Sequence, residues 1–476
     1  MRNLPLLVST FIFALLIGVL STRFAVFPST TILQGLKSGM ALTSAVLPAT
    51  WHKQPRFRRI SDKQASDIVG NRWQSGPAAD QFDPKGTLVT GGLWQFMEHC
   101  PDYGCIAVAY NPDKSVAQAW PYRPFAIFDQ RNLKVNRELE AFLFSPMYNA
   151  NPVGAKRAKD GSLIITFHMH GGVFPFGLAI AKLGPDGTPI WSRLDYSHHW
   201  LTLVEQPDGD HMIYTPALDV GDGSISFTTG QGFATQNTVL HCETAKPYWD
   251  TVSVLDSDGA QLAYIKLTEQ MVSSNWRTIL KRTVDNCDPT HLNYVDVVRA
   301  ENISSDAPAG PLHPGDMLVS MRNISAIGLI DGKTHELKQV YGGNFSRQHS
   351  VHHLKDQKIL IFDNQGGDEF TDGSRVIEID LATGKDRRIF PHATTPAPDD
   401  RFFTDVAGHI SISADRTRLL ATATRQSRAY DIDLATGALI ATYDHLHDVR
   451  DKADHFPDAA TDKGAAFELM AVEFID

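Results

Sequence analysis

The sequence predicts an all-β protein, a six-bladed β-propeller preceded by an N-terminal transmembrane helix. Two observations support this prediction. After residue 60, short alternating apolar runs that end in acidic turns recur six times, and helical periodicity is weak. The stretch from Leu4 to Thr22 carries no charge and is mostly Leu, Ile, Val, Phe and Ala. The 476-residue chain has 42% hydrophobic and 21% charged residues, which is typical of a folded globular protein.

The six repeats resemble β-hairpins, because strands with a period of two flank a turn rich in Asp and Gly. The last two repeats share the turn Leu-Ala-Thr-Gly. Successive acidic turn positions lie 57, 70, 75, 49 and 53 residues apart. A four-stranded blade needs about 40–50 residues plus loops, so this spacing predicts six blades. The apolar runs with their acidic turns are 125–129, 180–186, 252–256, 327–331, 376–380 and 429–433.

Further strand-like runs lie between the hairpins, at 161–167, 315–321 and 358–362. We expect the final run, 465–475, to close the ring. The alternative is an irregular multi-sheet β-protein whose turns are alike by chance. In a propeller the blades surround a central channel, so residues far apart in the sequence meet there.

The apolar N-terminal stretch reaches the length of about 20 residues that spans a bilayer as a helix. No small-x-small cleavage site follows it, so we expect an uncleaved signal-anchor. The predicted organisation is a signal-anchor at 1–23, a membrane-proximal linker or helix at 24–75, and the propeller at 76–476. We expect the propeller to be exported, to the periplasm or the cell exterior, and held at the membrane by this helix.

Charge and cysteine content narrow the class of protein further. The net charge is −10, which argues against a nucleic-acid-binding surface. The four cysteines are an even number, as suits an exported protein. Cys100 and Cys105 are close enough in sequence for a local disulfide, which would leave Cys242 to pair with Cys287. Three connectivities are open to four cysteines, and four unpaired buried thiols are the other alternative.

Histidines are numerous, at 19, and several flank predicted strands. His168 and His170 alternate along one predicted strand, so their rings share a face and form a candidate metal site. No carboxylate-rich pattern accompanies this pair, so we favour a histidine-rich channel wall and predict no metal. The other histidines of this kind are His198, His199, His291, His349, His352 and His353.

Four short motifs occur in order between residues 288 and 364. They are His291-Leu-Asn293, the run from Gly315 to Arg322-Asn323, Gln348-His349-Ser350, and Phe362-Asp363-Asn364. Two further elements stand at 198–209 and 403–409. This set resembles the bacterial arylsulfate sulfotransferases over about residues 190–430. The chain has Trp200 where that family has Asp after a double histidine.

The resemblance implies a six-bladed propeller that moves a sulfuryl group from a phenolic sulfate ester to a phenol. The family uses no nucleotide donor, so no cofactor is expected, and a histidine is transiently sulfated. By motif position, His349 matches the nucleophile, and His291 and Arg322 match two supporting residues. His199 matches the remaining histidine, with His198 as an adjacent candidate.

The chemistry of sulfuryl transfer suits these residue types. Arg322 offers a charged planar fork for sulfate oxygens, and cationic donors stabilise the charge of the transition state. A neutral imidazole at His349 is a competent nucleophile. His291 or His199 would protonate the leaving phenolate and later deprotonate the acceptor. Asn293 shares a strand face with His291, where it would orient a ring or a sulfate oxygen.

Two other functions compete with this interpretation. One is a non-catalytic propeller that binds a ligand or a protein through the histidine-lined pocket. The other is a metal-dependent propeller hydrolase, for which Asp363-Asn364 and Asp368-Glu369 are the candidate ligands. The sulfotransferase interpretation requires two small partners, a phenolic sulfate donor and a phenol acceptor, and the sequence does not define an oligomeric state.

Overall fold

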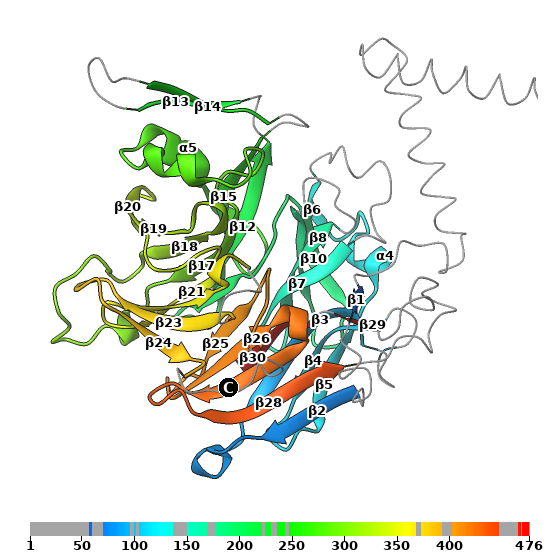
Figure 1. Ribbon diagram of the computed structural model, residues 1–476. Helices are drawn as coiled ribbons and strands as arrows, with labels where there is room; N and C mark the ends of the chain where they lie inside the picture. The colour runs from blue at the N-terminus through cyan, green and yellow to red at the C-terminus, as the bar shows by residue number, and fades with distance from the viewer. Residues whose placement is uncertain are drawn as a thin grey trace, which may run out of the picture.

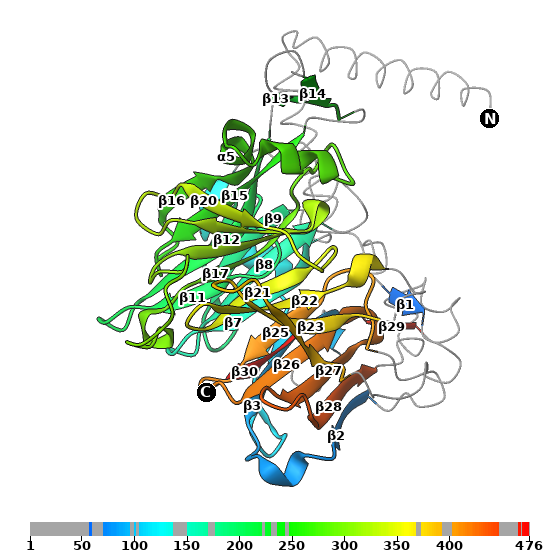
Figure 2. The same cartoon turned by 60° about the vertical axis from the view of Figure 1, so that its left-hand side comes forward.

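Six β-sheets form the six blades of a propeller (Figures 1 and 2). One edge strand of each sheet faces the centre; β21, for example, contacts the edge strands β17 and β25 of both neighbouring blades. The computed structural model describes residues 57–59, 70–95, 100, 104–136, 150–169, 177–220, 224–229, 236–242, 247–367, 373–392, 402–446, 465–467 and 469–475. The predicted fold class, an all-β six-bladed propeller, is therefore confirmed.

The strands of the first three blades follow one another from the inner edge outward. Blade 1 contains β30 (Leu469–Ile475), β3 (Gly86–Gln95), β4 (Cys105–Tyr110) and β5 (Val116–Pro121). Blade 2 contains β7 (Ala150–Arg157), β8 (Leu163–Met169), β9 (Gly177–Leu183), β10 (Pro189–Leu194) and β6 (Leu133–Asn136). Blade 3 contains β11 (Thr202–Glu205), β12 (His211–Val220), β15 (Tyr248–Leu255) and β16 (Gln261–Lys266).

The other three blades follow the same order. Blade 4 contains β17 (Leu292–Val297), β18 (Met317–Met321), β19 (Ala326–Ile330) and β20 (Leu337–Tyr341). Blade 5 contains β21 (His349–Lys355), β22 (Lys358–Asp363), β23 (Arg375–Asp380) and β24 (Asp386–Phe390). Blade 6 contains β25 (His409–Ile412), β26 (Arg418–Ala423), β27 (Arg428–Asp433), β28 (Leu439–Leu446) and β2 (Gly70–Ser75).

Both ends of the described chain contribute to ring closure. The final run pairs as predicted, because β30 is antiparallel to β3 and forms the inner strand of blade 1. At the other end, β2 pairs with β28 as the outer strand of blade 6. Residues 70–75, which the sequence assigned to the linker, are thus part of the propeller. A separate two-stranded pairing joins β1 (Phe57–Arg59) to β29 (Ala465–Phe467).

Each blade has a β-hairpin whose turn is held by an aspartate. The Asp carboxylate accepts the backbone N–H two residues further on, which is an Asx turn. Five of these turns are the acidic turns predicted from the sequence. The donors to Asp186, Asp256, Asp331, Asp380 and Asp433 are the N–H groups of Thr188, Asp258, Lys333, Ala382 and Ala435, at 2.9–3.0 Å.

The prediction for the first hairpin, at 125–129, is wrong. This segment begins the short helix α4 (Pro124–Ile127), because Pro124 pre-sets the backbone of a first helical turn. The hairpin of blade 1 is instead β4–β5, where Asp113 accepts the N–H of Ser115 at 2.9 Å. The predicted count of six blades is still right, because blade 1 has the β4–β5 hairpin in place of the one predicted at 125–129.

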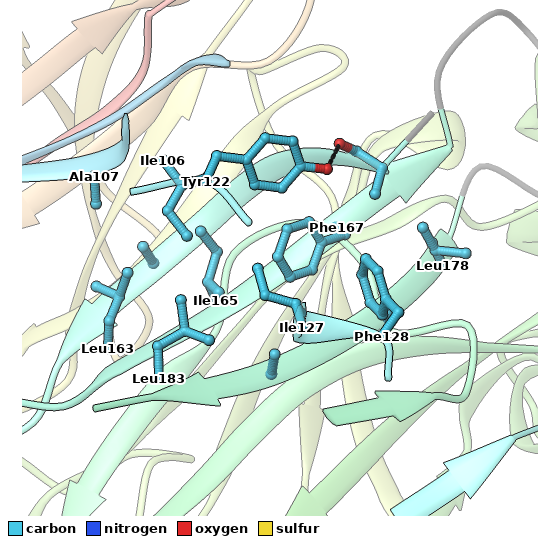
Figure 3. Close-up of a cluster of buried hydrophobic side chains, with 14 of the residues drawn as sticks. Ile106, Ala107, Tyr122, Ile127, Phe128, Leu163, Ile165, Phe167, Leu178 and Leu183 are labelled. Atoms are coloured by element: carbon cyan, nitrogen blue, oxygen red, sulfur yellow. Dashed lines mark hydrogen bonds between the residues drawn. The ribbon is translucent and has the colours of Figure 1, made fainter. Parts of the chain in front are cut away.

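The hydrophobic core is divided into six clusters, each centred between two neighbouring blades. Figure 3 shows the cluster between blades 1 and 2, where Ile106 packs near Leu163 and Ile165. The hydroxyl of Tyr122 crosses between the sheets and donates to the carbonyl of Ala150 at 2.8 Å. Outside this ring, the hairpin of β13 (Ile225–Thr229) and β14 (Gln236–Leu240) lies beside α5 (Leu267–Ser273) (Figure 1).

The four cysteines form two disulfides, Cys100–Cys105 and Cys242–Cys287. These are the two pairings that the sequence analysis named among three possible connectivities. None of the helices in the described part of the chain has the length and apolar character to cross a bilayer. The predicted span at residues 4–22 lies outside the described residues.

Replacing Cys242 and Cys287 with serine is expected to lower the free energy of unfolding by up to about 4 kcal/mol, because the cross-link restricts the unfolded chain. The loop that it closes spans 45 residues. The matched variant without Cys100–Cys105, with a separation of 5 residues, should lose only about 2 kcal/mol. Urea unfolding measures both, and equal stability of the wild type and the first variant would contradict this expectation.

Candidate functional site

The predicted site residues gather at one end of the central channel, where the inner strands begin. His349 is the first residue of β21, and His291 directly precedes β17. His199 precedes β11, and its ring centroid lies 5.1 Å from that of His291. Trp200, at the same level, makes an edge-on contact with His349 at 6.2 Å. Residues from blades 3, 4 and 5 therefore meet in one place, as the propeller topology predicts.

Asn364 fixes the tautomer of His349. The amide nitrogen of Asn364 donates to the carbonyls of Thr404 and Ala407, at 3.0 and 2.8 Å. Its oxygen must therefore be the atom facing His349 Nδ1, at 2.7 Å. An amide oxygen only accepts, so Nδ1 carries the proton and Nε2 carries the lone pair. Burial and the charge of Arg322 hold the pKa of His349 well below its usual range, so this imidazole is neutral at neutral pH.

The variant Asn364→Asp is expected to move the acid limb of the pH–rate profile upward by about one to three pH units. A carboxylate beside Nδ1 would favour the protonated imidazole of His349 and so remove the nucleophile at higher pH. Burst release of phenolate from an aryl sulfate, followed between pH 4.5 and 8, measures the limb. A lower rate with an unchanged pH profile would instead assign Asn364 a purely structural role.

The charge of Arg322 acts on His349, and most N–H groups of its guanidinium make no hydrogen bond to the described residues. It begins a 3₁₀ turn after β18, and its guanidinium donates to Oδ1 of Asn323 at 2.9 Å. Within the described residues, no carboxylate pairs with Arg322 or with Arg347. Burial and the charge of Arg347 lower the pKa of Arg322, while the carboxylates of Asp288 and Asp405 act in the opposite direction. A pair of guanidinium groups suits an oxyanion with several oxygens.

His291 forms a dyad with Asp288. Nδ1 of His291 contacts Oδ2 of the buried Asp288. The loop is fixed to the Arg322 turn, because the N–H of Arg322 donates to His291 O at 3.1 Å and Asn323 Nδ2 donates to Asp288 O at 2.6 Å. The carboxylate orients the ring, so that its other nitrogen, Nε2, is the one available for proton transfer.

The remaining predicted residues are buried beside this dyad. Nδ1 of His198 lies 2.6 Å from Nδ1 of His199, so the two rings share a proton. Oδ1 of Asp250 lies 3.9 Å from Nε2 of His198. Burial and the charge of Asp288 raise the pKa of Asp250 well above its usual range. Asn293 is fully buried and donates to Gln348 O at 2.9 Å, so it holds the backbone next to His349.

Three imidazoles, those of His168, His198 and His199, have their nearest ligand atoms within 4.8 Å of one another. The Nδ1 atoms of His198 and His199 are 2.6 Å apart, whereas two nitrogens on one tetrahedral zinc lie about 3.3 Å apart. Nε2 of His168 accepts the N–H of His199 at 2.9 Å. The trio as arranged is hydrogen-bonded to itself and to the backbone. His170, the other member of the candidate metal pair, lies outside the described residues.

The candidate hydrolase ligands are also committed to other contacts. Oδ1 of Asp363 accepts the N–H groups of Ser346 and Gln365, at 2.8 and 2.9 Å. Its Oδ2 pairs with Arg375 at 2.6 Å. Asn364 faces His349 through its amide oxygen. Asp368 and Glu369 lie outside the described residues.

Beneath His349, a polar network fills the channel. Oγ of Ser350 lies 2.9 Å from Nε2 of His352 and 3.4 Å from Nδ1 of His409. His409 reaches Glu473 at 3.0 Å. Trp200 stacks on His409 with ring centroids 5.4 Å apart. These side chains separate the His349 end of the channel from its other end.

Acid is expected to destabilise the fold steeply below pH 6.5. Burial lowers the pKa values of five fully buried histidines, and also those of the less buried His211 and His353, so the unfolded chain binds protons that the native state does not. Each such group lowers stability by about 1.4 kcal/mol per pH unit as pH falls below 6.5 and until its native pKa is reached. Asp250, whose pKa is raised, offsets one of them. The five are His198, His199, His349, His352 and His409.

Urea unfolding at pH 7.5, 6.0 and 5.0 measures this effect. A free energy of unfolding that stays constant across that range would contradict the neutral state of the buried histidines. The variant His313→Asn provides the control, because its side chain is 66% exposed and its loss should leave the slope unchanged.

Sequence reasoning missed several residues of this site. Asn364 was considered only as a metal ligand, although its place at the end of β22 in the Phe-Asp-Asn motif gave the signal. Arg347 stands two residues before His349, within reach of the same motif. Asp288 was assigned no role, although it stands three residues before His291, and Asp250 lies 41 positions before His291 with no local pattern to mark it.

Comparison with known proteins identifies one family. The arylsulfotransferase (ASST) family profile matches residues 249–445, which confirms the resemblance seen in the motifs. No curated protein matches the chain.

Similar solved structures are distant. A putative 6-phosphogluconolactonase from Bacteroides fragilis is 11% identical, covering 83% of this chain and 99% of its own, with a TM-score of 0.37. A catalytically inactive virginiamycin B lyase from Staphylococcus aureus is 13% identical, covering 60% and 83%, with a TM-score of 0.33. At these scores the likeness carries no argument about function.

Proposed function

We propose that the protein, whose residues 249–445 match the arylsulfotransferase family profile, moves a sulfuryl group from a phenolic sulfate ester to a phenol through a sulfated His349. The observation that carries this proposal is the hydrogen bond from His349 Nδ1 to Asn364. It leaves the lone pair on Nε2, and the low pKa keeps that nitrogen unprotonated at neutral pH. A neutral, oriented imidazole beside a guanidinium is the arrangement that attack on a sulfate ester needs.

In the first half-reaction, Nε2 of His349 attacks sulfur, an N–S bond forms, and the bond from sulfur to the aryl oxygen breaks. The protonated His291, held by Asp288, gives its proton to the departing phenolate. Arg322 and Arg347 hold the sulfuryl oxygens, whose charge persists in the transition state. His349 keeps its Nδ1–H bond to Asn364 throughout.

In the second half-reaction, the acceptor phenol gives its proton to the now neutral His291. Its oxygen attacks sulfur, the N–S bond breaks, and His349 returns to the neutral state. His198 and His199 lie beside His291. They are proposed to line the part of the site that receives the aromatic rings of the substrates. They are also proposed to take up the proton that His291 exchanges with the phenol. Asn293 is proposed to act through the backbone at Gln348, as a positioning residue.

The compartment belongs to the same proposal. Two disulfides suit an oxidising environment, which supports export of the propeller. The N-terminal stretch 1–23 is proposed to hold it at the membrane.

Two-substrate kinetics test the proposal. With a nitrophenyl sulfate as donor and a phenol as acceptor, a covalent intermediate predicts ping-pong behaviour and parallel double-reciprocal lines. Intersecting lines would contradict the sulfated histidine. Binding of both compounds without any transfer would favour the non-catalytic propeller.

A further inference from the structure

A cavity opens at the end of the channel opposite His349, where the inner strands finish. Its volume is about 400 Å³. The seven residues of β21 span about 20 Å from the level of His349 to this end. Trp200 and His409 lie between the two ends, and Glu473, which His409 reaches at 3.0 Å, already belongs to the cavity lining. The cavity is therefore distinct from the site around His349.

Two half-buried guanidinium groups, those of Arg299 and Arg416, line this cavity without a carboxylate partner in the described part of the chain. A third, Arg157, is exposed and donates to Gln118 Oε1 at 3.2 Å. Arg299 donates to the carbonyl of Leu203 at 2.9 Å. Arg416 donates to the carbonyls of His353 and Leu354, at 2.9 and 2.7 Å. Each contact uses only one nitrogen, Nη2 of Arg299 and Nη1 of Arg416, so both forks retain donors. The two lysines of the lining are paired with carboxylates, Lys156 with Glu473 and Lys159 with Glu205.

The positive charges of Arg299 and Arg416 repel each other, and both act on the imidazole of His352. Burial and the charge of Arg299 lower the pKa of Arg416, while the carboxylates of Asp296, which also lines the cavity, and Glu301 act in the opposite direction. The charges of Lys156, Arg416 and Arg299 also contribute to the low pKa of His352, which lies on the cavity wall. Like charges held together in a half-buried cavity cost free energy that a bound anion offsets.

Apolar side chains from several blades line the rest of the cavity wall. They include Leu88, Leu203, Val297, Ile412 and Phe474. A cavity of this volume exceeds a single oxyanion, so an apolar body has room beside the charged group. We propose that this far cavity is a binding site for a small organic oxyanion, with its anionic head between Arg299 and Arg416 and its apolar body against this wall.

Calorimetry on the full chain with 4-bromobenzoate tests the proposal, because a carboxylate cannot donate a sulfuryl group. We expect Arg299→Gln combined with Arg416→Gln to weaken one binding event by about tenfold or more. Arg322→Gln should leave that event unchanged. The control that removes the exposed Arg131 and Arg387, with the same change in net charge, should also leave it unchanged.

If the site around His349 also binds 4-bromobenzoate, the wild type binds two equivalents. The Arg299→Gln and Arg416→Gln variant then loses the equivalent in the far cavity, and Arg322→Gln loses the equivalent beside His349. One equivalent that only the Arg299 and Arg416 variants remove would support the far cavity, and the proposed function is then tested separately by the transfer kinetics. Unchanged binding in those variants would overturn the proposal. Competition by benzenesulfonate or phenyl phosphate then ranks the head groups.

Crystals of the wild type soaked with 4-bromobenzoate give a test that does not depend on any variant folding. The expected result is an anomalous bromine peak in the far cavity, with density for the carboxylate between the two guanidinium groups. The absence of a peak there at saturating probe would overturn the proposal.

Discussion

Replacing His349 with asparagine is expected to abolish sulfuryl transfer, lowering kcat/KM by roughly 10⁴-fold or more. The asparagine amide nitrogen takes the place of Nδ1 and still donates to Asn364, so the variant removes Nε2 and little else. The fold should survive, since the imidazole is neutral in the native protein. Release of phenolate from a nitrophenyl sulfate measures the loss.

A buried histidine at the other end of the same strand provides the matched control. His353 lies on β21, and its Nε2 donates to Asp356 O at 2.9 Å. His353→Asn should keep transfer within a few-fold of the wild type when both variants unfold at similar urea concentrations. Equal activity in His349→Asn and wild type would rule out His349 as the nucleophile.

Arg322→Gln is expected to lower kcat by roughly 10²- to 10³-fold, because a preorganised cationic donor to the transition state is lost. The effect should exceed that on KM, since the charge shift to the leaving oxygen occurs only during reaction. Arg322→Lys should recover part of the rate, as it keeps the charge but not the planar fork.

The comparison variant for Arg322 is Arg387→Gln, which removes an exposed guanidinium paired with Glu378. It should leave kcat and KM unchanged. A loss in Arg322→Gln that appears only in KM would show that this residue binds the donor without stabilising the transition state. Measuring both parameters with the same donor separates these cases.

The fold was predictable because its signal is local. Each Asx turn needs only an aspartate and the two following residues, so five of the six blade hairpins could be located from short runs. The first was misplaced because the apolar run 125–129 ends in an aspartate as the others do, although Pro124 starts a helix there. The outer strand β2 was missed because its partner β28 is more than 360 residues away.

The candidate site was predictable where a motif holds the residue. His349, His291 and Arg322 come from three motifs, and the inner strands bring them together. The partners that set their protonation are harder to find. Asp250 acts from another blade, and the role of Asn364 depends on the carbonyls of Thr404 and Ala407, 40 and 43 residues further on. Only the folded chain shows which of its amide atoms faces the imidazole.

The most direct test of the sulfated histidine is the intact mass of the full chain after exposure to an aryl sulfate without acceptor. The account predicts a single added SO₃ group on the wild type, lost when phenol is supplied and missing from His349→Asn. An adduct that persists in His349→Asn would contradict it. Complete transfer by a wild type that never carries the adduct, even in a rapid quench at a single turnover, would contradict it as well.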